Sequence, residues 1–148
     1  MRGQAADVAD DVASETWIAA SRGLRAFSGD ADAFRAWLFT IARHRLIDAR
    51  RSAKRQVPTV SADAAIFDSA ALAMSTEDAA LHAVAGDEAV RRIVALLPAD
   101  QAEAILLRVV ADLSVEQVAA IIGKRPGTVR VLQSRGLKRL AERLRKNL

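Results

Sequence analysis

Most of the positively charged side chains of this chain lie in two short stretches. Of the 22 Lys and Arg residues, six fall within residues 43–55 and nine within residues 124–146. Each stretch holds a single acid, Asp48 in the first and Glu142 in the second. Ammonium and guanidinium groups bind phosphate, so this arrangement indicates a protein that holds one polyanion at two places. The alternative is that both stretches are ordinary solvated helix surfaces.

The second stretch begins inside a spacing that is typical of a helix-turn-helix. Ala119 is followed by Gly123 four residues later and by Val129 six residues after that. A small side chain lets two helices cross closely, a glycine accepts positive φ in the turn, and a β-branched residue fills the shared core. The expected core residues of this motif are Val118, Ile122, Val129 and Leu132.

The outer surface of the second helix of this motif carries residue types that read DNA. Cations bind phosphate oxygens, whereas Gln, Ser and Thr also form hydrogen bonds with base edges. The candidate DNA-binding residues here are Arg125, Thr128, Arg130, Gln133, Ser134, Arg135 and Lys138. A plain helical hairpin would also match the spacing, but the nine cations in this region favour DNA.

Helices must position both stretches, because apolar residues recur at helical rather than alternating spacing along the chain. Residues 56–76 interrupt this pattern: they are rich in Ala, Ser and Asp, include Pro58 and contain no Lys or Arg. We therefore predict an all-α protein of two small helical domains joined by a flexible linker. The predicted domains are residues 1–55 and residues 77–148, the second containing the helix-turn-helix, and the linker is residues 56–76.

Local signals set the expected helices of the first domain. An acidic, Ala-rich helix is predicted over residues 5–22, ending at Gly23, and a second helix over residues 32–54. The second helix has an apolar face with the spacing i, i+3, i+4, i+7, which must be covered. This face consists of Phe34, Trp37, Leu38 and Ile41.

Similar signals divide the second domain. We predict a helix over residues 77–97 with a break near Gly86, and a helix to residue 111 with Pro98 in its first turn. Ser114 and Gln117 form a capping box that starts a short helix ending near Gly123. Pro126 opens the last helix.

The chain offers little for catalysis or metal binding. It has two His, no Cys, no ligand cluster at metal spacing and no Gly-rich phosphate loop. We therefore expect no enzymatic activity, no metal and no cofactor. The first eleven residues lack the apolar segment of a signal peptide, and no stretch reaches about 18 apolar residues, so we expect a cytoplasmic protein without membrane insertion.

Two parts of the chain together resemble the extracytoplasmic-function sigma factors, the promoter-recognition subunits of bacterial RNA polymerase. Residues 11–17 (DVASETW) and 34–51 (FRAWLFTIARHRLIDARR) resemble region two of that family from its polymerase-binding helix onward. Residues 97–101 (LPADQ), 113–123 (LSVEQVAAIIG) and 126–130 (PGTVR) resemble region four. Since the resemblance starts at the polymerase-binding helix, we expect the family's preceding helical segment to be missing. The apolar side chains Phe34, Trp37 and Leu38 of the first domain would then lack part of the helix surface that covers them.

The resemblance implies a role for each group of residues. The polymerase-binding residues would be Asp10, Asp11, Ser14, Glu15 and Trp17. On the second helix, His44, Asp48, Arg51 and Arg55 are spaced i, i+4, i+7, i+11 and would read the non-template strand of the minus-ten element. The phosphate-binding cations there would be Arg43, Arg50 and Lys54, with Arg45 beside them. The loop of residues 23–32 would help to capture an unstacked base, and the last helix would read the minus-thirty-five element.

The leading hypothesis is thus an alternative sigma factor that binds core RNA polymerase and promoter DNA and is inhibited by an anti-sigma factor. A second hypothesis is a free-standing helix-turn-helix regulator that binds DNA as a dimer. A third is a helical adaptor whose basic faces meet an acidic protein. Only the first requires polymerase for tight, sequence-specific binding, and only the third lacks a steep dependence on salt.

Overall fold

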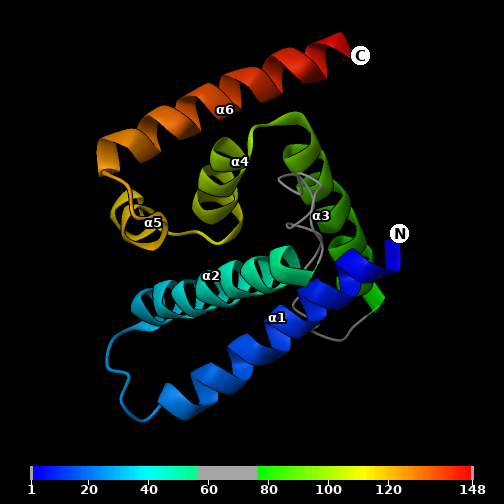
Figure 1. Cartoon of the computed structure of the whole chain (residues 1–148). Helices are drawn as coiled ribbons and strands as arrows, with labels where there is room; N and C mark the ends of the chain where they lie inside the picture. The colour runs from blue at the N-terminus through cyan, green and yellow to red at the C-terminus, as the bar shows by residue number, and fades with distance from the viewer. Residues whose placement is uncertain (1, 57–76, 148) are drawn as a thin grey trace.

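Every regular element in the described part of the chain is a helix, as the sequence predicts (Figure 1). The computed structural model describes residues 2–56 and 77–147, and the side chains within residues 7–55 and 86–147. The predicted linker therefore lies outside the described residues, except for Gln56, which ends a helix. The elements are α1 (Arg2–Gly23), α2 (Ala31–Gln56), α3 (Glu77–Leu96), α4 (Ala99–Ile105), the π-helical η1 (Leu106–Val110), α5 (Val115–Ile122) and α6 (Pro126–Lys146).

The first two helices form an antiparallel pair whose loop is fixed by aromatic packing (Figure 1). The ring of Phe27 in the loop stacks on Trp37 at a centroid distance of 5.0 Å and meets Phe34 edge-on at 5.6 Å. A Cβ on Gly23 would lie 2.9 Å from the Trp37 ring, so only glycine lets α1 end against α2 in this way. Asp30 caps α2 by accepting the amide hydrogen bond of Ala33 at 2.8 Å.

The pair α1 and α2 has a thin core of its own. Thr16 and Ala20 are the only buried residues among the described side chains of residues 7–55. The predicted apolar face of α2 is half-buried, while Trp17 and Ile18 of α1 and Leu24 in the loop after it are about half exposed. Apolar burial in the described structure is therefore concentrated in the C-terminal helices.

The helix-turn-helix is formed by α5 and α6 and has the predicted local structure. The Ser114 hydroxyl accepts the Gln117 amide hydrogen bond at 3.1 Å, and the Gln117 side chain accepts that of Ser114 at 2.9 Å. Gly123 has φ +68°, in the left-handed region, and Pro126 is the first residue of α6. All four predicted core residues are buried, with Val118 and Val129 fully so.

Two local predictions in the second domain are wrong, and a third is correct in extent but not in helix type. Pro98 precedes α4 as its N-cap, because its ψ of 149° is extended while its carbonyl accepts the first helical hydrogen bond, from Ala102 at 2.9 Å. Gly86 does not break α3, since one glycine costs only about 1 kcal/mol in a long helix. The helix expected to reach about residue 111 does extend to Val110, but its last turn is the π-helical η1, in which the Ala111 amide donates to the Leu106 carbonyl at 3.0 Å, five residues back.

The helices stack in the order α1, α2, α5 and α6, with α4 beside α5 (Figure 1). The core between α4, α5 and α6 extends to α2, because Ala36 and Phe39 pack against it. The second helix thus contacts α1 on one side and the C-terminal helices on the other. Among the described residues, no helix is long and apolar enough to cross a membrane.

Candidate nucleic-acid interface

The outer face of α6 is open to solvent over its first four turns. The helix buries Val129, Leu132 and Gly136 on its inner face, so the side chains between them point outward. Arg130 is within 3.4 Å of Glu116 of α5, but both side chains are more than 60% exposed and the pair is therefore weak. Six of the seven residues predicted on this face are exposed: Arg125, Thr128, Arg130, Ser134, Arg135 and Lys138.

The seventh predicted residue, Gln133, is half-buried and held by a residue that the sequence did not single out. Its Oε1 accepts a hydrogen bond from Arg108 Nε at 3.3 Å. Arg108 also donates to the carbonyl of Leu113. The signal that could have identified Arg108 is its position as a lone cation in an otherwise apolar run, residues 104–111. Arg108 fixes the amide of Gln133 at the edge of the reading face.

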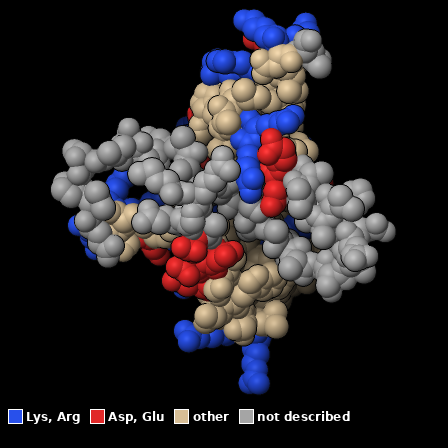
Figure 2. Space-filling view, turned by 90° about the vertical axis from the view of Figure 1, so that its right-hand side faces the viewer, with Lys and Arg blue, Asp and Glu red and all other residues tan. Residues whose placement is uncertain are grey.

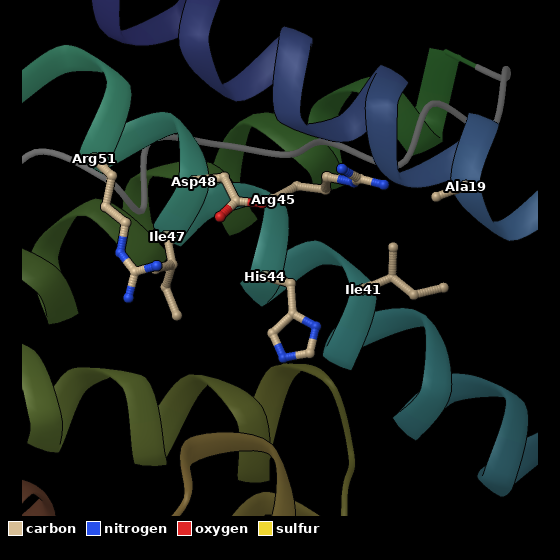
Figure 3. Close-up of a pocket in the computed structure, with 7 residues that line it drawn as sticks. All are labelled: Ala19, Ile41, His44, Arg45, Ile47, Asp48 and Arg51. Carbon is tan, nitrogen blue, oxygen red and sulfur yellow. The ribbon is translucent and has the colours of Figure 1, made fainter. Parts of the chain in front are cut away.

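The predicted minus-ten residues all lie on α2 but occupy different sides of it. Figure 3 shows His44 and Arg51 on one side of the helix, whereas Arg45 reaches toward Ala19 of α1. These residues belong to the lining of an open pocket of about 550 Å³ that runs along α2 and includes one residue of α1. Its lining is Ala19, Ile41, His44, Arg45, Ile47, Asp48 and Arg51. This lining combines apolar side chains with cations and one carboxylate.

Two of the predicted phosphate-binding cations, Arg43 and Arg50, lie on a different face of α2. Arg43 on this face contacts the C-terminal helices. Arg43 Nε lies 2.6 Å from Glu103 Oε1 of α4, and the two side chains are 28% and 20% exposed. Arg50 lies about two turns further along the same face and is half-buried. Its Nε has no accessible surface and no hydrogen-bond partner among the described residues. Lys54 and Arg55, at the end of the helix, are exposed.

Two further polar contacts join α2 to the C-terminal part of the chain, beside the apolar packing of Ala36 and Phe39. Arg35 Nη1 lies 3.4 Å from the Asp112 carbonyl and 3.6 Å from its carboxylate. The Gln117 side chain donates to the Asp32 carbonyl at 3.3 Å. Each contact joins residues 60 to 85 positions apart, and no local pattern marks such pairs. The sequence analysis therefore missed Glu103, Arg35 and Asp112 as contact residues.

The predicted polymerase-binding residues form an exposed acidic surface on α1. Asp10, Asp11, Ser14 and Glu15 are all exposed, and Trp17 adds an aromatic side chain that is 48% exposed. Figure 2 shows Lys and Arg at the top and at the bottom of that view, with Asp and Glu between them. Within residues 7–55 and 86–147, no group of three or more His, Asp or Glu could hold a metal ion.

Both halves of the chain match known protein families. Residues 2–56 match the family model "Sigma-70 region 2", and residues 87–140 match "Sigma-70, region 4". These matches occur in the same order and at the same places as the resemblances read from the sequence.

Three curated relatives are similar over almost the whole chain. ECF RNA polymerase sigma factor SigD of Mycobacterium tuberculosis is 36% identical, with 92% of this chain and 63% of that protein covered. ShbA of Streptomyces griseus is 33% identical over 93% of this chain and 72% of its own length. BldN of Streptomyces coelicolor is 32% identical, with 92% of this chain and 50% of that protein covered. The chain thus spans less than two thirds of the length of SigD.

A solved structure has a similar arrangement of helices. It is the sigma factor RpoE of Bartonella quintana in complex with the anti-sigma factor NepR. The match has a TM-score of 0.66 and 29% sequence identity, and it covers 94% of this chain and 82% of that chain.

Proposed function

Because this chain belongs to the extracytoplasmic-function family of RNA polymerase sigma factors, we propose that it binds core RNA polymerase and directs it to promoters. The observation that carries this proposal is the pair of matches, region 2 over residues 2–56 and region 4 over residues 87–140, each of which includes a helix with exposed cations. In this role the polymerase supplies the chemistry, and the chain acts in the cytoplasm as a specificity subunit.

In this proposal α6 reads the minus-thirty-five element as duplex DNA. Its exposed face carries cations for phosphates and short polar side chains for base edges. Arg130 is the leading base-reading candidate, because it is long, exposed and near the start of the helix, where recognition helices contact bases. Arg108 supports the reading face by fixing Gln133.

The minus-ten element is assigned to α2. In this assignment the pocket of about 550 Å³ along α2 would take an unstacked base, with isoleucine side chains for apolar contact. His44 and Arg51, which lie on the side of α2 away from α1, would form hydrogen bonds with the neighbouring part of the strand. Stacking and phosphate contacts there would offset the cost of unpairing a base, a few kcal/mol. Lys54 and Arg55 extend the cationic surface along the strand.

The acidic surface of α1 is assigned to core polymerase. Exposed carboxylates at Asp10, Asp11 and Glu15 would face basic residues of the polymerase, and Trp17 would be desolvated at the centre of the contact. An anti-sigma factor is a further expected partner, since the similar solved structure is a complex of a sigma factor with one.

Transcription in vitro tests this proposal. Core RNA polymerase with the purified chain should initiate from a subset of a randomised promoter library, and the selected sequences should share two elements separated by a fixed spacing. Core polymerase alone and the chain alone are the controls. A chain that selects a palindrome without polymerase would instead be the dimeric regulator, and no selection at all would remove both functions.

A further inference from the structure

One apolar side chain lies among the candidate reading residues of α6. Val131 is 46% exposed. The helix buries Val129, Leu132 and Gly136 on its inner face, and Val131 lies about 200° around the helix from Val129, so its side chain points outward. Its neighbours on the helix surface, three or four residues away, are Gly127, Thr128, Ser134 and Arg135. The last three are candidate DNA-binding residues, so Val131 stands within the reading face.

Val131 is separate from the other exposed apolar side chains of its helix. These are Leu137 and Leu144, each 44% exposed. At about 100° per residue, they lie roughly 120° and 140° away from Val131 around α6. Within α6, all of whose residues have described side chains, Val131 is therefore not part of a continuous apolar patch of the kind that binds a protein. Helix formation does not favour it either, because valine has a lower helix propensity than Arg, Lys or Gln.

Gly127 leaves open space beside Val131. Side chains of a helix lean toward its N-terminus, so the side chain of Val131 lies over the turn that contains Gly127. A Cβ added to Gly127 would meet no heavy atom within 4 Å. The isopropyl group of Val131 is therefore accessible from the N-terminal side, and the N-terminal part of a recognition helix is the part that contacts base edges.

The chemistry of the major groove limits what such a side chain can recognise. Base edges present nitrogen and oxygen donors and acceptors there, and the one apolar group among them is the C5-methyl group of thymine. Valine forms no side-chain hydrogen bonds, so a polar base edge placed against it loses water and gains no partner. Contact with a methyl group, in contrast, removes two apolar surfaces from water.

We propose that Val131 contacts the C5-methyl group of one thymine in the upstream promoter element and thereby selects thymine over cytosine at that position. The inference rests on the proposed function, because that function places α6 in the major groove. The cationic and hydroxyl side chains around Val131 hold the duplex against the helix, and Val131 adds the contact that depends on the methyl group. Burial of one methyl-sized group corresponds to about a fourfold change in affinity.

Replacement of single thymines by uracil tests the contact at the level of one methyl group. Uracil keeps the base pairing and the O4 acceptor of thymine and lacks only the C5-methyl group. The upstream element is first selected from the randomised library by polymerase carrying the wild-type chain, and each thymine on either strand is then replaced in turn. At one position, uracil should lower the affinity of this holoenzyme for the DNA by about fourfold. Holoenzyme with Val131→Ser should bind the thymine and uracil DNAs equally at that position.

Leu137→Ser is the matched control, because Leu137 is exposed to nearly the same extent on another side of α6. This variant should keep the fourfold difference between the two DNAs. Val131→Ile should keep it as well, since isoleucine retains a branched apolar side chain. Each comparison is made between two DNAs bound by the same variant, so a change in protein stability or in polymerase binding affects both DNAs equally.

Three results would overturn the proposal: an upstream element that contains no thymine, a wild-type holoenzyme insensitive to uracil at every position, or a difference that persists in Val131→Ser. If Val131→Ser keeps the difference and lowers the affinity for core polymerase, Val131 belongs to a protein contact instead. Absence of polymerase-dependent initiation by the wild-type chain would refute the proposed function, and this inference with it, whereas the three results above refute the inference alone.

Discussion

Gly136 of α6 lies so close to Ile105 of α4 that a Cβ added to the glycine would come 2.6 Å from the Ile105 Cδ1 atom. Both residues are buried, and the Cβ of Gln101, one turn earlier on α4, would be 3.3 Å away. The absence of a side chain at Gly136 therefore sets how closely the two helices cross. This crossing fixes α6 on the domain and so fixes the direction of its outer face.

The first prediction concerns this crossing. Gly136→Ala should destabilise the chain by about 1–3 kcal/mol, because the added methyl overfills a packed contact. Chemical denaturation measures the change. Gly127→Ala is the control, since a Cβ there meets nothing within 4 Å and alanine favours a helix. Equal stability of the two variants would show that the domain repacks without cost.

The capping box gives a second stability prediction. Ser114→Ala removes the hydroxyl that accepts the Gln117 amide hydrogen bond and should cost about 1 kcal/mol. The control is Ser52→Ala, at an exposed interior position of α2, which should change the free energy of unfolding by less than about 0.5 kcal/mol. A loss in Ser52→Ala as large as in Ser114→Ala would argue against a role for the cap.

Arg130 gives a prediction about promoter choice. Arg130→Ala should relax selection at one position of the upstream element and cost about 1–3 kcal/mol there, because a long exposed donor at the start of α6 is lost. Arg143→Ala is the control: this cation lies in the last turn and should weaken binding equally for all sequences. Selection from a randomised promoter library by polymerase carrying each variant measures both effects, the change in sequence preference and the change in overall binding. Unchanged selection by Arg130→Ala would remove this residue from base reading.

Salt dependence measures the phosphate contacts. If about five phosphates are engaged, log K should fall with log salt at a slope near −4.5, and Lys138→Ala should make that slope about 0.9 shallower. Thr128→Ala, which changes a neutral side chain on the same face, should leave the slope as it is. A slope unaffected by Lys138→Ala would place that ammonium away from phosphate.

The surface of α1 gives a prediction about polymerase. Trp17→Ala should lower the affinity for core polymerase more than Asp11→Ala does, because desolvated aromatic side chains contribute most at interfaces, often about 2 kcal/mol or more. Neither variant should alter promoter sequence preference. Ser21→Ala, exposed on the same helix, is the control. Competition with a labelled sigma factor for core polymerase measures the affinities, and equal binding by all variants would move the contact away from α1.

Local chemistry explains which parts of the fold could be predicted. The helix-turn-helix follows from Ser114, Gly123 and Val129, whose capping, φ angle and packing act within a few residues. The contact between Arg43 and Glu103 could not be predicted, because the two residues are 60 positions apart and each looks like an ordinary surface charge in the sequence. The exposed outer face of α6 follows from helical periodicity alone. The half-burial of Gln133 depends on Arg108, which comes from a different helix.

The length of α6 limits what its last turns can do. Twenty-one residues at about 1.5 Å each make a rod of roughly 32 Å, whereas the major groove is about 12 Å wide and curves around the duplex. A straight helix can therefore follow the curved major groove for only a few of its turns. If α6 enters the major groove as proposed, we expect Arg143, Arg145 and Lys146 to lie beyond the edge of the groove, where they would contact the sugar-phosphate strand and contribute affinity that does not depend on sequence.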